Sequence, residues 1–127
     1  MDLANASVAQ VLLPVKNLDD AIEFYRHTLG LPFLFTAPPQ MAFFQCGSVR
    51  LLVGVPPDSI HFQPGSAIYF RVSDINEVYN SLLERGVEFQ AEPHVIYRTL
   101  ETDLWLAEFT DPDGNQLALM AETQAAT

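Results

Sequence analysis

Residues 105–120, WLAEFTDPDGNQLALM, decide the fold, because they contain a complete turn between two apolar strands. Pro112 presets the backbone for the first central position of a turn, and Gly114 or Asn115 can adopt the positive φ that closes it. The residues after the turn alternate between two faces, as the residues of a β-strand do. We therefore predict a β-hairpin whose turn is residues 111–115.

Size and composition predict one globular domain. A chain of 127 residues can bury about two-thirds of its unfolded surface around a single core. No apolar run approaches the roughly 20 residues that cross a bilayer. The first ten residues contain no basic residue followed by an apolar segment, so we expect neither a signal nor a transit peptide, and a cytoplasmic location.

Charge and cysteine content exclude several classes of function. A formal net charge of −10 argues against nucleic acid and anionic membrane surfaces as partners. It would suit a cationic ligand, or it serves solubility alone. The single Cys46 excludes an internal disulfide and a cysteine cluster for zinc or iron–sulfur binding, and its apolar neighbours predict an inert thiol.

The same order of elements occurs twice along the chain. Asn17 caps a predicted helix that Gly30 closes, and Ser73 or Asp74 caps a second helix that Gly86 closes. The predicted strands of the first half are residues 8–15, 31–36, 41–46 and 49–55. Those of the second half are residues 66–72, around 87–90 and on through 94–98, 104–110 and 116–120. The sequence therefore predicts an α+β fold made of two βαβββ units, about residues 5–57 and 64–122.

Two motifs connect this duplication to a known family. They are V-x-N-L-D-x-A-I-x-F-Y…L-G-L at residues 15–31 and F-x-D-P-D-G-N at residues 109–115. Together with the repeated unit they resemble the vicinal oxygen chelate superfamily, which includes glyoxalase I, bleomycin- and fosfomycin-resistance proteins, methylmalonyl-CoA epimerase and extradiol dioxygenases. The resemblance covers nearly the whole chain. It implies a single domain of incompletely closed, cupped mixed sheets with helices on the outer face, but no particular activity.

The resemblance also implies positions for a metal site. In metal-dependent relatives one ligand comes from each of four strands on the concave face, and these positions correspond here to Gln10, Leu51, Ala67 and Ala118. Only Gln10 can coordinate a metal ion, whereas a catalytic divalent ion generally needs about three protein ligands. We therefore expect no metal site and no cofactor.

Strand alternation from these positions predicts the lining of a mostly apolar, aromatic cavity. Met120 shares a face with Ala118, and Tyr69 and Arg71 share a face with Ala67. The family register puts Leu106 and Glu108 on the concave face as well. The predicted ligand-binding residues are Gln10, Phe43, Leu51, Ala67, Tyr69, Arg71, Trp105, Leu106, Ala118 and Met120.

Glu108 and His94 are the candidate catalytic residues. Glu108 could act as a general base or pair with a ligand cation; alternatively, it is an edge-strand glutamate or a partner for Arg71 or Arg98. His94 could be an acid, a base or a displaced metal ligand, or simply a solvated loop residue. Trp105 could stack on a ligand at the cavity mouth, or belong to the core or a dimer interface. We expect no functional role for His27 and His61.

Three functions remain open. The leading one is a metal-free binder of a small organic molecule, flat or cationic, similar in plan to bleomycin-resistance proteins. The alternative is a lyase, isomerase or dioxygenase that uses Glu108 as base, or a displaced metal site built from Gln10, His94 and Glu108. The third is a dimeric interaction or regulatory module whose cavity is filled by side chains. The resemblance implies a homodimer, in which residues 41–46 could pair as an edge strand.

Overall fold

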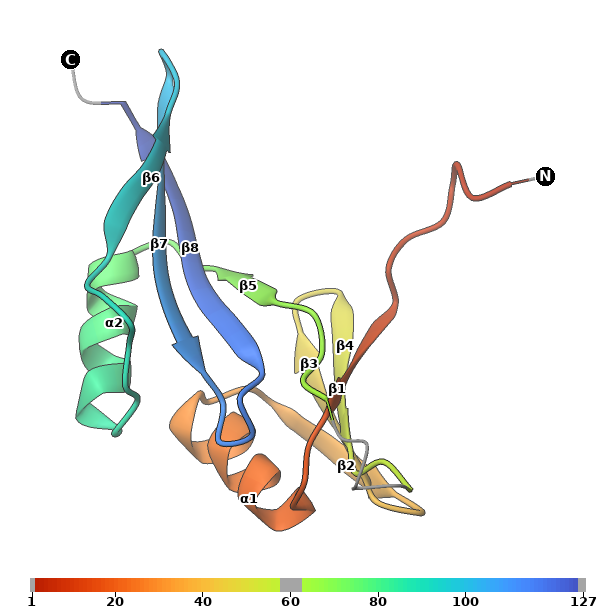
Figure 1. Cartoon of the computed structure of the whole chain (residues 1–127). Helices are drawn as coiled ribbons and strands as arrows, with labels where there is room; N and C mark the ends of the chain where they lie inside the picture. The colour runs from red at the N-terminus through yellow and green to blue at the C-terminus, as the bar shows by residue number, and fades with distance from the viewer. Residues whose placement is uncertain (1, 58–62, 126–127) are drawn as a thin grey trace. The chain divides into compact units, whose positions relative to one another are not determined.

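The structure, a computed structural model, describes residues 2–57 and 63–125 and divides into two compact units, Met1–Gly65 and Ser66–Thr127 (Figure 1). The elements of the first unit are β1 (Gln10–Pro14), α1 (Leu18–Ile22), the π-helix η1 (Glu23–Thr28), β2 (Phe33–Ala37), β3 (Met41–Cys46) and β4 (Val49–Gly54). Those of the second are β5 (Ile68–Arg71), α2 (Ile75–Glu84), β6 (His94–Arg98), β7 (Thr102–Thr110) and β8 (Gln116–Gln124). The predicted α+β fold of two βαβββ units is confirmed.

Both units build an open mixed sheet with the same topology. The strand orders are β1-β4-β3-β2 and β5-β8-β7-β6. In each sheet the first and last strands of the unit pair in parallel, and the other pairs are antiparallel. Met41–Cys46 is therefore an interior strand between β4 and β2, which corrects its predicted place at a sheet edge.

The two helices begin and end as their sequences predict. Asn17 accepts a hydrogen bond from the Asp20 amide, and Asp74 rather than Ser73 caps α2 by accepting one from the Glu77 amide. Gly30 and Gly86 follow the helices with φ of 80° and 93°. The first helix widens into η1, where the Leu29 amide donates to the Phe24 carbonyl five residues back at 2.8 Å. None of the described helices is long and apolar enough to span a membrane.

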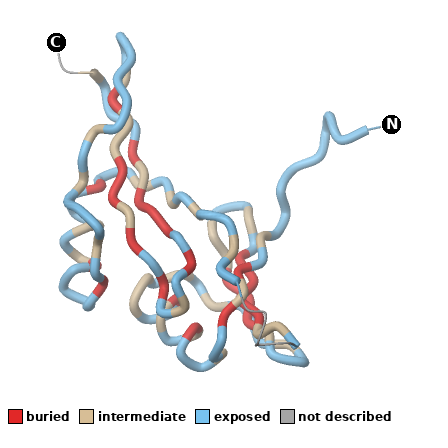
Figure 2. Tube along the Cα trace, in the orientation of Figure 1, coloured by how far each residue is buried: buried red, intermediate tan, exposed pale blue. Residues whose placement is uncertain are grey.

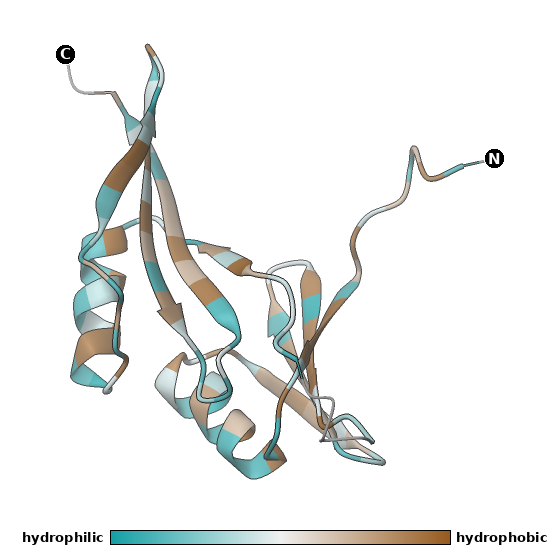
Figure 3. Ribbon diagram, in the orientation of Figure 1, coloured by the Kyte–Doolittle hydropathy of each residue, from teal (hydrophilic) through white to brown (hydrophobic). Residues whose placement is uncertain are grey.

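Aromatic side chains join each helix to one face of its sheet. In the first unit the ring of Tyr25, on η1, lies 5.9 Å from that of Phe44 on β3. In the second unit the rings of Tyr79, Phe89 and Phe109 follow one another at 4.6 and 5.0 Å, from α2 to β7. Buried residues concentrate along the strands (Figure 2), where apolar and polar residues alternate (Figure 3). Each sheet thus has a helix face and an opposite face, called here the open face.

The largest differences from the predicted strand bounds lie in the second unit. The residues around 87–90 form only an isolated bridge between Phe89 and Phe109, and β6 begins at His94. β8 continues beyond Met120 to Gln124, since it pairs with an equally long β7 from Thr102 onward. The polar residues 122–124 had no strand-like apolar alternation, so pairing with β7, and not propensity, makes them a strand.

Candidate functional site

The turn of the signature hairpin is held by its own polar groups. The Asp111 carboxylate, only 4% exposed, accepts hydrogen bonds from the Asp113 and Asn115 amides at 2.9 and 2.8 Å and from Asn115 Nδ2 at 2.8 Å. Of the two residues that could close the turn, Gly114 takes the positive φ, 88°. With its carboxylate occupied and buried, Asp111 stabilises the turn and presents no free acid to a ligand.

Most predicted site residues of the second unit lie together on its open face. Tyr69 and Glu108 both oppose Ala118, from β5 and β7, while Arg71 and Leu106 both oppose Met120. His94, the first residue of β6, opposes Leu106. Since side chains of opposed residues stand on the same face, this surface combines an apolar strip with the Glu108 carboxylate, a guanidinium, a phenol and an imidazole. Glu122, which opposes Leu104, adds a second carboxylate to it. The expectation that Arg71 and Tyr69 share the face of Ala118 and Met120 agrees with this register.

The charged groups of this face have the following partners. Arg71 pairs with Glu122 at 3.3 Å, and Arg98 pairs with Asp103 at 3.6 Å, so neither arginine is the partner of Glu108. Glu108 has no ion-pair partner among residues 2–57 and 63–125. His94 is exposed, and its Nδ1 lies 2.9 Å from the Glu92 carbonyl oxygen. Glu108 is therefore available for a ligand contact on this surface.

The two remaining predicted site residues of the second unit are Trp105 and Ala67. Trp105 stands on the helix face of β7, which it shares with Ala107 and Phe109 by strand alternation. It opposes Ala121, and its indole N–H donates to the Thr123 hydroxyl at 2.9 Å. Ala67 precedes β5 and is exposed. Of the two histidines expected to have no role, His27 is exposed on η1, and His61 lies outside the described residues.

In the first unit the register corrects one predicted orientation. Leu51 opposes Phe44, whose ring lies against Tyr25, so Leu51 stands on the helix face. The β4 residues that share the open face with Gln10 are Arg50 and Leu52. The error arose because an apolar run such as LLV, residues 51–53, carries no alternation from which its facing could be read.

The open face of the first unit consists of three rows of side chains that run across the sheet. The first row is polar: Gln10, Arg50 and Gln45. The second is apolar: Leu12, Leu52, Phe43 and Phe35. The third is Pro14, Gly54, Met41 and Ala37. Polarity thus changes along the strand direction, from an arginine at one end to hydrocarbon at the other.

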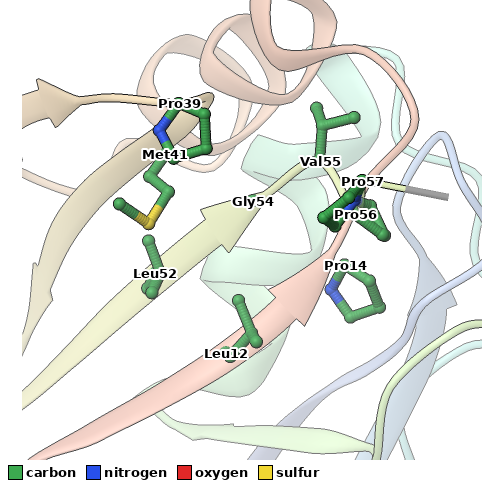
Figure 4. Close-up of a pocket in the computed structure, with 9 residues that line it drawn as sticks. All are labelled: Leu12, Pro14, Pro39, Met41, Leu52, Gly54, Val55, Pro56 and Pro57. Atoms are coloured by element: carbon green, nitrogen blue, oxygen red, sulfur yellow. The ribbon is translucent and has the colours of Figure 1, made fainter. Parts of the chain in front are cut away.

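A pocket of about 340 Å³ opens over the apolar end of these rows (Figure 4). Leu12 and Leu52 project into it from neighbouring strands, with Met41 beside them. The complete lining is Leu12, Pro14, Pro39, Met41, Leu52, Gly54, Val55, Pro56 and Pro57. Leu12 remains 58% exposed, so apolar surface is left open to solvent here. This pocket was not predicted from the sequence, although Gln10, Leu12 and Pro14 are alternate residues of one strand and therefore share a face.

The positions that correspond to a metal site in relatives do not fit a metal here. Gln10 offers one neutral amide oxygen, Leu51 faces the helix, and Ala67 and Ala118 have no donor atom. Within residues 2–57 and 63–125, no three His, Cys, Asp or Glu side chains are grouped so that they could hold a metal ion.

Comparison with known proteins gives consistent matches. The profile of the Glyoxalase/Bleomycin resistance protein/Dioxygenase superfamily matches residues 7–119. The uncharacterized protein YraH of Bacillus subtilis (strain 168) is 28% identical over 123 residues, which cover 87% of this chain and 94% of that protein.

Two solved structures represent the structural matches. A superfamily member from Sphaerobacter thermophilus is 27% identical, with a TM-score of 0.77 and coverage of 91% of this chain and 97% of that one. Lactoylglutathione lyase from Agrobacterium tumefaciens is 22% identical, with a TM-score of 0.73 and coverage of 91% and 93%. The second match, at this identity, speaks for the fold alone.

Proposed function

This chain belongs to the Glyoxalase/Bleomycin resistance protein/Dioxygenase superfamily, and on that premise we propose that it binds a small organic molecule in the apolar pocket of its first unit, without the superfamily's metal site. The observation that carries the proposal is the pocket itself. Its volume of about 340 Å³ lies in the range of small-molecule sites, and its lining is hydrocarbon and a thioether. A module whose cavity is filled by its own side chains would not leave this space.

The chemistry of the lining limits what the pocket can do. None of its side chains can donate a proton, accept one at neutral pH or act as a nucleophile. It can hold an apolar group by removing it from water, at roughly 25 cal/mol per Å² of apolar surface buried. Binding, and not turnover, is therefore the function that this pocket supports.

A neutral naphthalene dye, N-phenyl-1-naphthylamine, tests the proposal. We expect its fluorescence to rise saturably when it is titrated with the protein. Gly54→Val should weaken this binding at least roughly 10-fold, because the new side chain enters the pocket. The fold should tolerate the change, since a Cβ at Gly54 would meet its first neighbour, Leu12 Cδ1, at an ordinary 3.6 Å.

Ala91→Val is the matched control, because it adds the same γ-carbons to an exposed loop of the other unit. It should bind the dye as the parent protein does. Equal dye affinity in Gly54→Val and the parent would show that the pocket is not the site, and the absence of saturable binding to the parent would contradict the proposed function.

A second candidate function rests on the open face of the second unit. Glu108, Tyr69 and Arg71 stand there around Ala118 and Met120, which favours a lyase, isomerase or dioxygenase that uses Glu108 as general base. Turnover of lactoylglutathione, the compound named for the A. tumefaciens structure, can be measured with and without added divalent metal. If turnover is found, Glu108→Gln should abolish it while Glu88→Gln leaves it intact. Equal rates in the two variants would remove Glu108 from the mechanism.

A homodimer and a cytoplasmic location remain predictions. Size-exclusion chromatography with light scattering would measure the first.

A further inference from the structure

We infer that the molecule bound in the first unit's pocket carries an anionic group, a carboxylate, sulfonate or phosphate, which Arg50 holds at the polar end of the open face. This inference rests on the proposed function and adds the ligand's charge to it. It departs from the cationic ligand that the net charge of −10 suggests.

Arg50 stands on the same face of the sheet as the residues that line the pocket. Arg50 and Leu52 are two residues apart on β4, so both side chains stand on the open face, about 7 Å apart along the strand. Leu52 lines the pocket, and Arg50 lies one row beyond it. A ligand whose apolar body fills the pocket would therefore bring a substituent at its edge within reach of the guanidinium.

The guanidinium lies over two aromatic rings. The rings of Phe35 and Phe43 stack at 4.6 Å, and the Arg50 guanidinium carbon lies 5.9 and 5.6 Å from their centroids. An arginine placed over aromatic rings keeps the in-plane N–H donors of its fork free for an anion. The contact with the two rings favours an Arg50 side chain that already lies on the open face, which lowers the entropy cost of binding.

The Arg50 guanidinium has no anionic partner within the part of the chain that the structure describes. Among residues 2–57 and 63–125 no acidic side chain forms an ion pair with it, and no acceptor receives a hydrogen bond from its side chain. Arg71 and Arg98, by contrast, both have carboxylate partners. Arg50 is therefore a cation with unused donors beside an apolar pocket.

The other side chains of the same face complete the charge pattern. The three rows on the open face of β1–β4 contain no aspartate or glutamate, and the neighbours of Arg50 across the sheet are the amides of Gln10 and Gln45. Gln45 Nε2 donates to the Gly47 carbonyl at 2.7 Å, which fixes that amide close to Arg50. A cationic ligand would find no counter-charge on this face, whereas an anion finds one arginine.

Two dyes that differ in one group test the inference. 1-Anilinonaphthalene-8-sulfonate is N-phenyl-1-naphthylamine with an added sulfonate, so the ratio of their affinities measures the contribution of the negative charge. Arg50→Gln should weaken binding of the sulfonate dye roughly 10-fold or more, the loss expected for a hydrogen bond between charged groups. It should change the affinity for the neutral dye less than about threefold.

Arg26→Gln is the matched control. Arg26 also lies over a phenylalanine ring, 4.9 Å from the centroid of Phe33, and is exposed as Arg50 is, but it lies on η1 and not on the open face beside the pocket. The control should leave both affinities unchanged, and circular dichroism should show the same melting curve for parent and variants. Arg50→Lys, which keeps the charge but loses the planar fork, should retain part of the preference for the sulfonate.

The possible results separate the two proposals. Selective loss of the sulfonate dye in Arg50→Gln supports the inference. Equal affinities of that variant and the parent for the sulfonate dye overturn it, while the proposed function stands if Gly54→Val still weakens binding of the neutral dye. Failure of the neutral dye to bind the parent overturns both.

Discussion

The Asp111→Asn variant gives the sharpest test of how the signature turn works. The substitution keeps the size and shape of the side chain but replaces one carboxylate oxygen with an NH2 group. The remaining oxygen can still accept hydrogen bonds from the Asp113 and Asn115 amides. The new Nδ2 would face Asn115 Nδ2, which donates to Asp111 Oδ2 at 2.8 Å in the parent. Two donors then oppose each other in a buried place.

The cost follows from these three contacts. Hydrogen bonds to a charged group contribute about 1.5–3 kcal/mol each and neutral ones about 0.5–1.5 kcal/mol. Weakening two backbone bonds by about 1 kcal/mol each and losing the third, which contributes about 1.5–3 kcal/mol, gives a loss of about 4 kcal/mol. Since domains of this kind are stable by only about 5–15 kcal/mol, the variant should unfold far more easily.

The measurement is urea unfolding followed by fluorescence of the single tryptophan, Trp105, which lies on the β7 strand of the same hairpin. At a typical slope of about 1–3 kcal/mol per molar urea, the midpoint should fall by at least about 1 M. Glu101→Gln is the control, because it removes one negative charge from an exposed turn of the same unit. A midpoint for Asp111→Asn within experimental error of Glu101→Gln would refute the structural role of the carboxylate.

Two further predictions concern single positions. Gly86→Ala should cost about 1–2 kcal/mol in thermal stability, because its φ is 93°, although a Cβ there would touch nothing within 4 Å. Gly54→Ala should cost less, because Gly54 has an ordinary φ and the nearest contact of its new Cβ would be 3.6 Å. Equal melting temperatures for Gly86→Ala and the parent would contradict this reasoning. Burial raises the pKa of the Cys46 thiol in the folded protein above that in the unfolded chain, because the folded protein disfavours the thiolate. The stability that comes from keeping this thiol protonated is complete below the pKa in the unfolded chain, and it is lost as the pH rises through the higher pKa in the folded protein. We therefore expect Cys46→Ser to lose less stability than the parent between pH 8 and 10, and iodoacetamide to react more slowly with the native thiol than with the urea-unfolded one.

The sequence predicted the elements that depend on local chemistry. The Asn17 and Asp74 caps, the closing glycines and the DPDGN turn each act through hydrogen bonds or φ values within a few residues, so their patterns can be read directly. The repeat of these signals gave the two βαβββ units. The widening of the first helix into η1 was not predicted, because residues 23–28 carry no local sequence signal for it.

The candidate site was predictable only where a strand alternates in polarity. β7 and β8 alternate, and Leu106, Glu108, Ala118 and Met120 were placed on one face as the register has them. Residues 51–53 of β4 are apolar in a row, so Leu51 was given the wrong facing, and Arg50 was not considered. The pocket depends on Pro39, Met41 and Pro56, which come from separate segments, and only the register of β1, β3 and β4 brings them together.

The parallel pairing of β5 with β8 has a consequence for how the second unit folds. β8 lies between β5 and β7, yet it is the last of these strands to be synthesised. Until it is made, β5 has no neighbour and β7 can pair only with β6, so the middle of the sheet must wait for its final segment. A ribosome-bound chain halted before residue 116 should therefore expose both strands to proteases and chaperones, and release of the remaining residues should protect them in one step.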